Sequence, residues 1–177
     1  MTLPKSELDD VDLTLMDLLQ KDGRLSNAKL AEQVSLSETP CWRRLKRLEA
    51  DGYISGYRAA LNRKKLGFGV LAFVQIGFGN HTGDAPLRFE TMLQSIPEVL
   101  SCHNLTGECD YLLQVVATDL EAFGVFVRDV LRELPGVSSI RSSLSLREVK
   151  ESGRLPLGRG GVTAPASPDS LACPRRR

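Results

Sequence analysis

Four cationic side chains lie within five consecutive positions, Arg43, Arg44, Lys46 and Arg47. Cations gathered on one side of a helix can neutralise phosphates and donate hydrogen bonds to base edges in the major groove of DNA. The surrounding segment, KLAEQVSLSETPCWRRLKRLEADGY, has the pattern of a short amphipathic helix, a three-residue turn and a second helix. This pattern is a helix-turn-helix, and it predicts a protein that reads double-stranded DNA.

The second helix has a clear apolar side. Cys41, Leu45 and Leu48 recur at i, i+4 and i+7, which predicts one buried stripe with the cations on the opposite side. Ser37 is expected to cap the helix by accepting from the first turn, where Pro40 is tolerated. The candidate DNA contacts lie on the outer side and at the start of this helix: Ser37, Thr39, Pro40, Trp42, Arg43, Lys46 and Arg47.

A simpler interpretation of the charge run is a solvated helix face, on which the cations pair with Glu49 and Asp51 at helical spacing. Here the run falls on the outer side of the second helix of a predicted three-helix unit. Leucines at positions 13, 15, 18 and 19 predict the first helix, ending near Gly23, and Leu30, Ala31 and Val34 predict the short one. The DNA interpretation is therefore preferred.

The distribution of charge divides the chain into three parts. Residues 1–65 carry 12 Lys and Arg against 10 Asp and Glu, residues 66–152 carry 6 against 11, and residues 153–177 carry 5 against 1. The slightly basic first part and the basic last part differ from the acidic middle part. This distribution fits a module that contacts DNA joined to a second module that phosphates would repel.

Targeting and membrane segments are not predicted. The start, MTLPKSELDD, is acidic and has no apolar core, which is unlike a signal peptide. The longest apolar run, residues 66–79, is short and glycine-rich for a transmembrane helix. We therefore expect a cytoplasmic, nucleoid-associated protein.

After residue 67 the apolar period changes from helical to alternating. Residues 53–61 predict a short hairpin or an extended linker. Strand patterns then cover residues 69–78, 99–105, 111–117 and 137–149, with helix stripes at 87–96 and 123–134. The order β-α-β-β-α-β predicts an α+β class: a ferredoxin-like four-stranded antiparallel sheet behind the helix-turn-helix.

Two helices can cover only one face of such a sheet. The first strand is nevertheless apolar on both sides, with Leu71 and Phe73 on the side opposite Val74 and Ile76. This pattern predicts an exposed apolar patch that packs on a second copy of the chain. A dimer also suits a helix-turn-helix, because two recognition helices can enter successive major grooves.

Several of these motifs, in this order, resemble the Lrp/AsnC (feast/famine) family of bacterial transcriptional regulators, with features closer to its leucine-responsive branch. The resemblance runs from about Leu8 to Leu157 and includes TPC at the start of the second helix, GYRAALN, TGECDYLL and VKESGRLPL. It implies an arm (1–7), a winged-type DNA-binding domain (8–52), a hinge strand or linker (53–67), an effector-binding and oligomerisation domain (68–152) and homodimers that assemble into octamers.

The resemblance also implies a free amino-acid effector at the turn of TGECDYLL. A turn with free backbone N–H groups can hold a carboxylate, and one aspartate can hold an ammonium group. A plain hairpin, with Gly107 at positive φ and Asp110 capping the turn, is the alternative. The candidate effector residues are Thr106, Gly107, Glu108, Cys109 and Asp110, with Ser142 and Ser143 as weaker candidates from a neighbouring subunit.

Other classes of function have less support. Cysteines 41, 102, 109 and 173 lack metal-site spacing, and Cys41 lies on the buried stripe. A thiol-based redox-sensing repressor using Cys102 and Cys109 and a nucleoid-organising protein remain as alternatives. His81 and His103 have no partner pattern, so we expect neither an enzyme nor a metal site. Residues 153–177, rich in Gly, Pro and Arg, are expected to be disordered.

Overall fold

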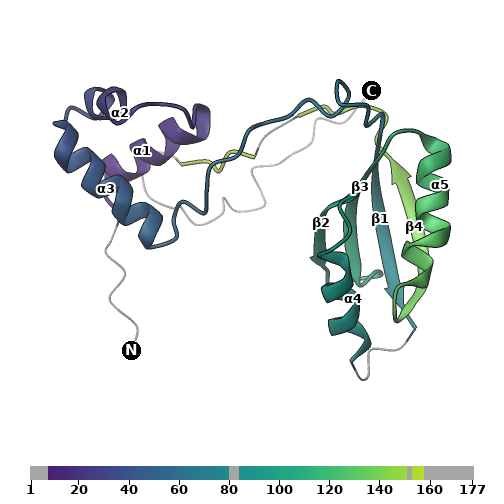
Figure 1. Ribbon diagram of the computed structural model, residues 1–177. Coiled ribbons are helices and arrows are strands. Elements are labelled where there is room, and N and C mark those ends of the chain that lie inside the picture. Colours follow the sequence, from purple (N-terminus) through teal and green to yellow (C-terminus); the bar gives the residue numbers. More distant parts are fainter. Residues whose placement is uncertain (1–7, 80–83, 151–152, 158–177) are drawn as a thin grey trace, which may run out of the picture. The chain divides into compact units, whose positions relative to one another are not determined.

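The computed structural model describes residues 8–79, 84–150 and 153–157 of this chain. Two compact units are present, and each is described by itself: residues 1–59 with 152–177, and residues 60–151 (Figure 1). The predicted arm, His81 and residues 158–177 of the predicted tail lie outside the described residues. No helix among the described residues is long and apolar enough to cross a membrane.

The first unit is a bundle of three helices, α1 (Asp10–Lys21), α2 (Asn27–Gln33) and α3 (Glu38–Ala50). Its core is formed by six buried side chains: Leu15, Met16, Leu30, Ala31, Cys41 and Leu48. Leu45 packs against this core, so the predicted stripe of α3 is confirmed. Ser35 adopts φ 55° in the turn between α2 and α3, a conformation that single turn residues can take at a modest energetic cost.

Residues 53–69, which follow α3, contain no strand. The structure thus has the extended linker rather than the hairpin. Tyr57 belongs to the first unit, and its hydroxyl donates to Glu49 Oε1 over 3.1 Å. Burial, followed by this hydrogen bond, raises the pKa of Tyr57 to about 12.

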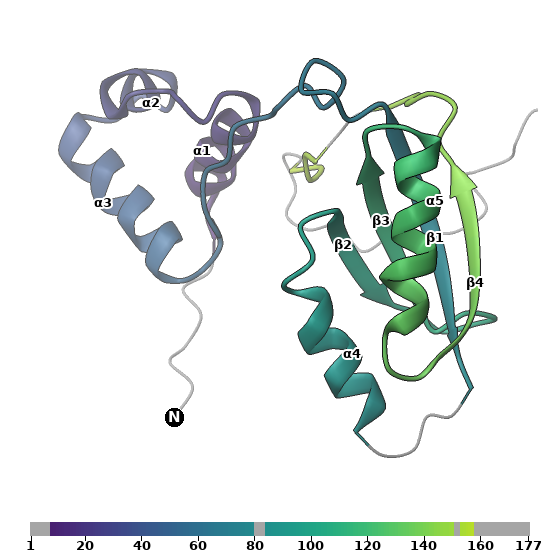
Figure 2. The ribbon, with the colours of Figure 1, turned by 45° about the vertical axis from the view of Figure 1, so that its right-hand side comes forward.

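The second unit is a four-stranded antiparallel sheet in the order β2-β3-β1-β4. The strands are β1 (Val70–Phe78), β2 (Val99–Asn104), β3 (Tyr111–Ala117) and β4 (Val137–Leu144), and the helices are α4 (Ala85–Leu93), α5 (Leu120–Asp129) and a 3-10 turn at Leu131–Glu133. Both helices cover the same face of the sheet (Figure 2). The predicted ferredoxin-like order is confirmed.

Strand β4 is shorter than the predicted strand. It ends at Leu144, where it pairs with Ala72, and Ser145 makes the last ladder bond to the carbonyl of Leu71. Strand β1 begins at Val70, so residues after Ser145 have almost no neighbouring strand to pair with. Leu146 is 97% exposed as a result. Alternation alone does not reveal where the partner strand ends.

The face of the sheet away from the helices is only partly open. Phe73 is 40% exposed and Leu100 is 56% exposed, whereas Leu71 is 6% exposed. Leu71 and Leu100 line a hollow of about 580 Å³ with residues 60–64 and 147–148. The exposed apolar patch is therefore narrower than the sequence predicted.

The end of the described chain returns to the first unit. The main chain of Leu155 bonds the side chain of Gln20 twice, Leu155 N donating to Oε1 over 2.6 Å and Gln20 Nε2 donating to the carbonyl over 3.2 Å. Leu157 packs against the apolar cluster of the three helices. These five residues are therefore part of the first unit rather than of the predicted disordered tail.

This contact predicts a difference between two neighbouring leucines. Leu157→Ala should lower the free energy of unfolding of the first unit by about 1–2 kcal/mol, because the lost side chain is partly buried. Leu155→Ala, at a side chain that is 68% exposed, should change it by less than about 0.5 kcal/mol. Chemical denaturation measures both values, and equal effects would mean that Leu157 does not pack on the helices.

Candidate functional site

The outer side of α3 carries a stripe of exposed side chains. Thr39, Trp42, Arg43 and Lys46 follow helical spacing, and all four are exposed. Trp42 is 54% exposed, which is unusual for so large an aromatic ring on a packed helix. Two cations, a hydroxyl and an aromatic ring can contact phosphates, base edges and thymine methyl groups.

Arg43 and Lys46 differ in their surroundings. Lys46 Nζ lies 2.7 Å from Glu49 Oε2 in an exposed pair, and this hydrogen bond is the largest cause that lowers the pKa of Glu49. Arg43 makes no ion pair within the described part of the chain. Exposed pairs of this kind contribute little stability, so both cations can turn toward a nucleic acid at small cost.

The structure corrects the predicted orientation of Arg47. Its guanidinium donates to Asp12 Oδ2 on α1 instead of lying on the outer side of α3. At 100° per residue, Arg47 lies on the flank of α3, within reach of α1. Arg44, which the sequence analysis did not assign, donates to Asp12 Oδ1 over 2.9 Å and to Asp9 Oδ2 over 2.6 Å.

Asp9 and Asp12 also form the N-terminal cap of α1. Asp9 accepts from the backbone N–H of Asp12 over 2.9 Å, and Asp12 accepts from the backbone N–H of Asp9 over 3.2 Å. The bond from the Asp12 backbone is the largest cause that lowers the pKa of Asp9, and Arg44 lowers it further. The hydrogen bond to Asp9 is in turn the largest cause that raises the pKa of Arg44.

The start of α3 is positioned differently from the prediction. Ser37 occupies the N-cap position with extended backbone angles, but its side chain makes no capping bond. Instead, Asn27 Nδ2 of α2 donates to the carbonyl of Glu38 over 2.9 Å. Pro40 lies in the first turn, as predicted. Because the exposed Ser37 side chain does not cap the helix, its hydroxyl can contact a ligand.

The predicted effector loop joins β2 to β3. Thr106, Gly107 and Glu108 are exposed, and Gly107 adopts φ 137°, which L side chains rarely take. The loop is closed at its base, because Leu105 N donates to the carbonyl of Asp110 over 2.8 Å. The tip of the loop is therefore open to solvent.

Asp110 has a structural role in this loop. Its Oδ2 accepts from the backbone N–H of Phe78 over 2.7 Å. Its own backbone N–H donates to the carbonyl oxygen of Ile76 over 2.9 Å. The carboxylate thereby ties the loop to the end of β1. The alternative interpretation had Asp110 cap the turn, whereas this bond joins the loop to the neighbouring strand β1. Any role in ligand binding must be compatible with this bond.

The structure separates the two serines of β4. Ser142 pairs with Val74, whose side chain is in the core, so Ser142 faces the helices and lines a hollow beside α5. Ser143 pairs with Phe73 and faces the other side of the sheet. Alternate residues of a strand point to opposite faces, so one subunit cannot present both serines to one pocket.

A second hollow adjoins the effector loop on the helix side of the sheet. Asn104 and Tyr111, at the two ends of the loop, line a cavity of about 410 Å³ together with Glu90, Leu93, Gln94, Val99, Ser101 and Cys102. Tyr111 Oη donates to Glu90 Oε1 over 2.7 Å. No local sequence pattern reveals Glu90, because its contact with Tyr111 depends on how α4 packs against β3.

The three described cysteines differ in how exposed they are. Cys41, Cys102 and Cys109 are free thiols, and Cys41 is buried in the core as predicted. Burial, and then the charge of Glu90, raise the pKa of Cys102. A raised pKa lowers the thiolate fraction at neutral pH, which disfavours Cys102 as the reactive thiol of the predicted sensor.

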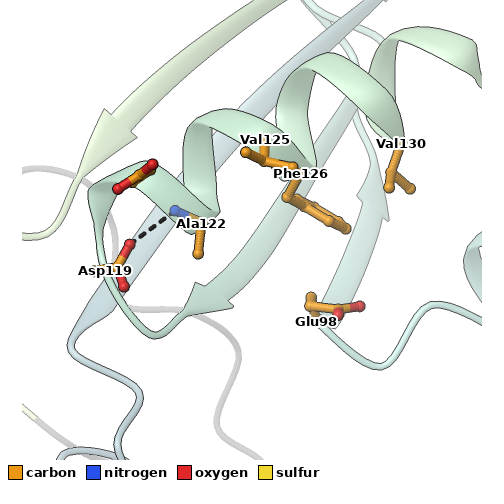
Figure 3. Close-up of a pocket in the computed structure, with 7 residues that line it drawn as sticks. Glu98, Asp119, Ala122, Val125, Phe126 and Val130 are labelled. Atoms are coloured by element: carbon orange, nitrogen blue, oxygen red, sulfur yellow. Dashed lines mark hydrogen bonds between the residues drawn. The ribbon is translucent and has the colours of Figure 1, made fainter.

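A third hollow, of about 500 Å³, lies between α5 and the start of β2 (Figure 3). Val125, Phe126 and Val130 form its apolar part, with Glu98 across from them. The Asp119 carboxylate at its edge caps α5 by accepting from Ala122 N over 2.8 Å. None of the predicted site residues lies here, and no cluster among the described residues could hold a metal ion.

A three-helix unit with an exposed cationic stripe and a separate α+β unit together define a DNA-binding regulator with an effector domain. Residues 8–55 match the winged helix-turn-helix DNA-binding model, and residues 71–155 match the Lrp/AsnC ligand-binding domain. The chain belongs to the Lrp/AsnC family and is a DNA-binding transcriptional regulator.

Curated and solved relatives support this assignment. The leucine-responsive regulatory protein of Escherichia coli K12 is 40% identical over 86% of this chain and 93% of its own length. The transcriptional activator DecR of the same organism is 41% identical over 85% and 99%. A Neisseria meningitidis transcriptional regulator, solved with L-Met, has a TM-score of 0.82 and 43% identity over 85% of this chain and 97% of its own.

The hydrogen bond between Tyr111 and Glu90 predicts how Tyr111 titrates. Burial, followed by the bond to Glu90, raises the pKa of Tyr111 from 10.0 to about 12. The stability linked to this shift is present below the unfolded pKa and is lost as pH rises through about 12. Glu90→Gln should lower the Tyr111 pKa only part of the way, because burial remains.

Ultraviolet titration of the phenolate, in a background with both Tyr53→Phe and Tyr57→Phe, measures this shift. The chain has three tyrosines, so these two substitutions leave Tyr111 as the source of the phenolate signal. An unchanged titration in Glu90→Gln would show that Glu90 does not act on Tyr111.

Proposed function

We propose that this regulator binds double-stranded DNA sequence-specifically through the outer stripe of α3. The observation that carries the proposal is the exposure of Thr39, Trp42, Arg43 and Lys46 on the side opposite the buried stripe of Cys41 and Leu48. The packed side fixes the helix, and the exposed side supplies donors of the kind that major-groove helices use. Ser37 and Pro40 lie at the start of α3, next to this stripe. In this proposal they contact the DNA backbone beside the groove.

The effector in this proposal is a free amino acid bound at the loop of residues 106–110. Backbone N–H groups near Gly107 hold the carboxylate, and Asp110 attracts the ammonium group. The names of the relatives support this class of effector, since one is leucine-responsive and another was solved with L-Met. Three other side chains of this loop would lie near the ligand. Thr106 and Glu108 are exposed, and Cys109 is half-buried.

The assembled state in this proposal is a homodimer that associates into an octamer. Phe73 and Leu100 on the open face of the sheet supply apolar surface for a second copy, and Ser143 lies on the same face. An effector that favours one assembly changes the spacing of the DNA-binding units. A coupling of about 1–3 kcal/mol is enough to change operator affinity substantially.

In this proposal the regulator acts in the cytoplasm, on the DNA of the nucleoid. A nucleoid-organising role uses the same DNA-binding face and the same assembly. The regulator is favoured because a ligand-binding domain makes up the second unit.

The DNA face is tested by two alanine substitutions. Arg43→Ala and Lys46→Ala should each weaken binding to an operator duplex obtained by in vitro selection. Each should also reduce the slope of log affinity against log salt by roughly 0.9, because one phosphate contact is lost.

Arg128→Ala is the matched control, because Arg128 is an exposed cation on α5. Fluorescence anisotropy over a salt series measures all three variants. Wild-type slopes in both α3 variants would show that the assigned face does not contact DNA.

The effector site is tested by Asp110→Asn. The amide oxygen can still accept from Phe78 N, so the loop should stay in place, but the charge that attracts an ammonium group is lost. The variant should lose the thermal shift produced by the responsive amino acid while keeping effector-free DNA binding.

Asp129→Asn, at an exposed carboxylate on α5, makes the same change in charge elsewhere in the unit. It should keep the effector response. A full response in Asp110→Asn would exclude Asp110 from the ammonium site.

A further inference from the structure

Half of the cations of α3 are engaged by α1. Arg44 and Arg47 both donate to the carboxylate of Asp12, while Arg43 and Lys46 extend from the exposed stripe. We call the cluster of Asp12, Arg44 and Arg47 the α1–α3 clamp. Its two arginines are cations that a salt-dependent DNA-binding protein would otherwise offer to phosphates.

Asp12 differs from an ordinary surface carboxylate. The residue is 0% exposed, the one buried charged residue among those described. A buried carboxylate requires cations and hydrogen-bond donors, and both of its oxygens are used: Oδ1 accepts from Arg44, and Oδ2 accepts from Arg47 and from the backbone of Asp9. Its position on α1 therefore fixes where the two guanidinium groups lie.

The surroundings of the two arginines hold them in place in different ways. Arg44 also pairs with Asp9 over 2.6 Å, so it has two carboxylate partners. Arg47 has its Nε buried without a partner, which shows how closely the side chain is packed against the protein. Moving either guanidinium to a phosphate would leave Asp12 buried with only one cation, which is costly.

We propose that Asp12 is a positioning residue that determines DNA specificity by withholding Arg44 and Arg47 from the phosphate backbone. This inference rests on the proposed DNA face. With the clamp closed, binding relies on Arg43, Lys46 and their exposed neighbours, which can reach base edges. With the clamp open, two more cations add phosphate contacts that carry no sequence information.

The first experiment compares Arg43→Gln with Arg47→Gln. The two residues are four positions apart on one helix, and the substitutions are chemically identical. Arg43→Gln should reduce the salt slope on the selected operator by roughly 0.9, and Arg47→Gln should leave the slope unchanged. An equal reduction in both variants would overturn the proposal, because Arg47 would then be a phosphate contact.

The second experiment opens the clamp with Asp12→Asn. The salt slope on a scrambled duplex should become steeper by roughly 0.9 for each arginine released, and the ratio of operator to scrambled affinity should fall at least about tenfold. Asp17→Asn is the matched control, because Asp17 is on the same helix but pairs with Lys21 at the surface. It should change neither quantity. An unchanged ratio in a folded Asp12→Asn protein contradicts the proposal.

A third measurement uses the wild-type protein, in case a clamp variant does not fold. Phenylglyoxal labelling followed by mass spectrometry reports the reactivity of each arginine with and without operator DNA. DNA should protect Arg43 and leave the labelling of Arg44 and Arg47 unchanged, whereas protection of Arg47 equal to that of Arg43 overturns the proposal. Absence of salt-sensitive binding by the wild type would instead refute the proposed DNA face itself.

Discussion

A carboxylate without access to water must be neutralised, and in this protein that constraint determines how α3 lies on the bundle. Asp12 is buried where α1 meets α3, and Arg44 and Arg47 supply its partners. Cys41 and Leu48, on the apolar stripe of α3, are buried in the core. The ion pairs add direction to that packing, because charged hydrogen bonds depend on geometry in a way that apolar contacts do not.

The two units differ in the chemical groups that they expose. The first presents cations on a rigid helix, and the second, with an excess of acidic residues, presents loops and hollows on a sheet. In the second unit the effector loop is tied to β1 by the Asp110 carboxylate, so a ligand at that loop would contact a residue that also holds the strand. Such shared use is one way in which binding can change the packing of a subunit.

Local patterns predicted most of the architecture. The spacing of Cys41, Leu45 and Leu48 located α3 and its buried side, because the helical period reflects backbone geometry. Short apolar runs located β1 and β3. The end of β4, the engagement of Arg47 and the opposite directions of Ser142 and Ser143 depend on neighbouring elements. Glu90 was missed for the same reason, since only the packing of α4 brings it to Tyr111.

The sequence by itself determined the class of this protein: a helix-turn-helix with an exposed cationic helix, followed by a βαββαβ domain. These features are encoded in residues close together along the chain, where apolar period and turn residues act locally. Only the tertiary structure decided which cations remain available to a ligand. That choice depends on Asp12, which is 32 positions before Arg44 and 35 positions before Arg47. Pairing between such distant charges follows from how helices pack rather than from either helix alone.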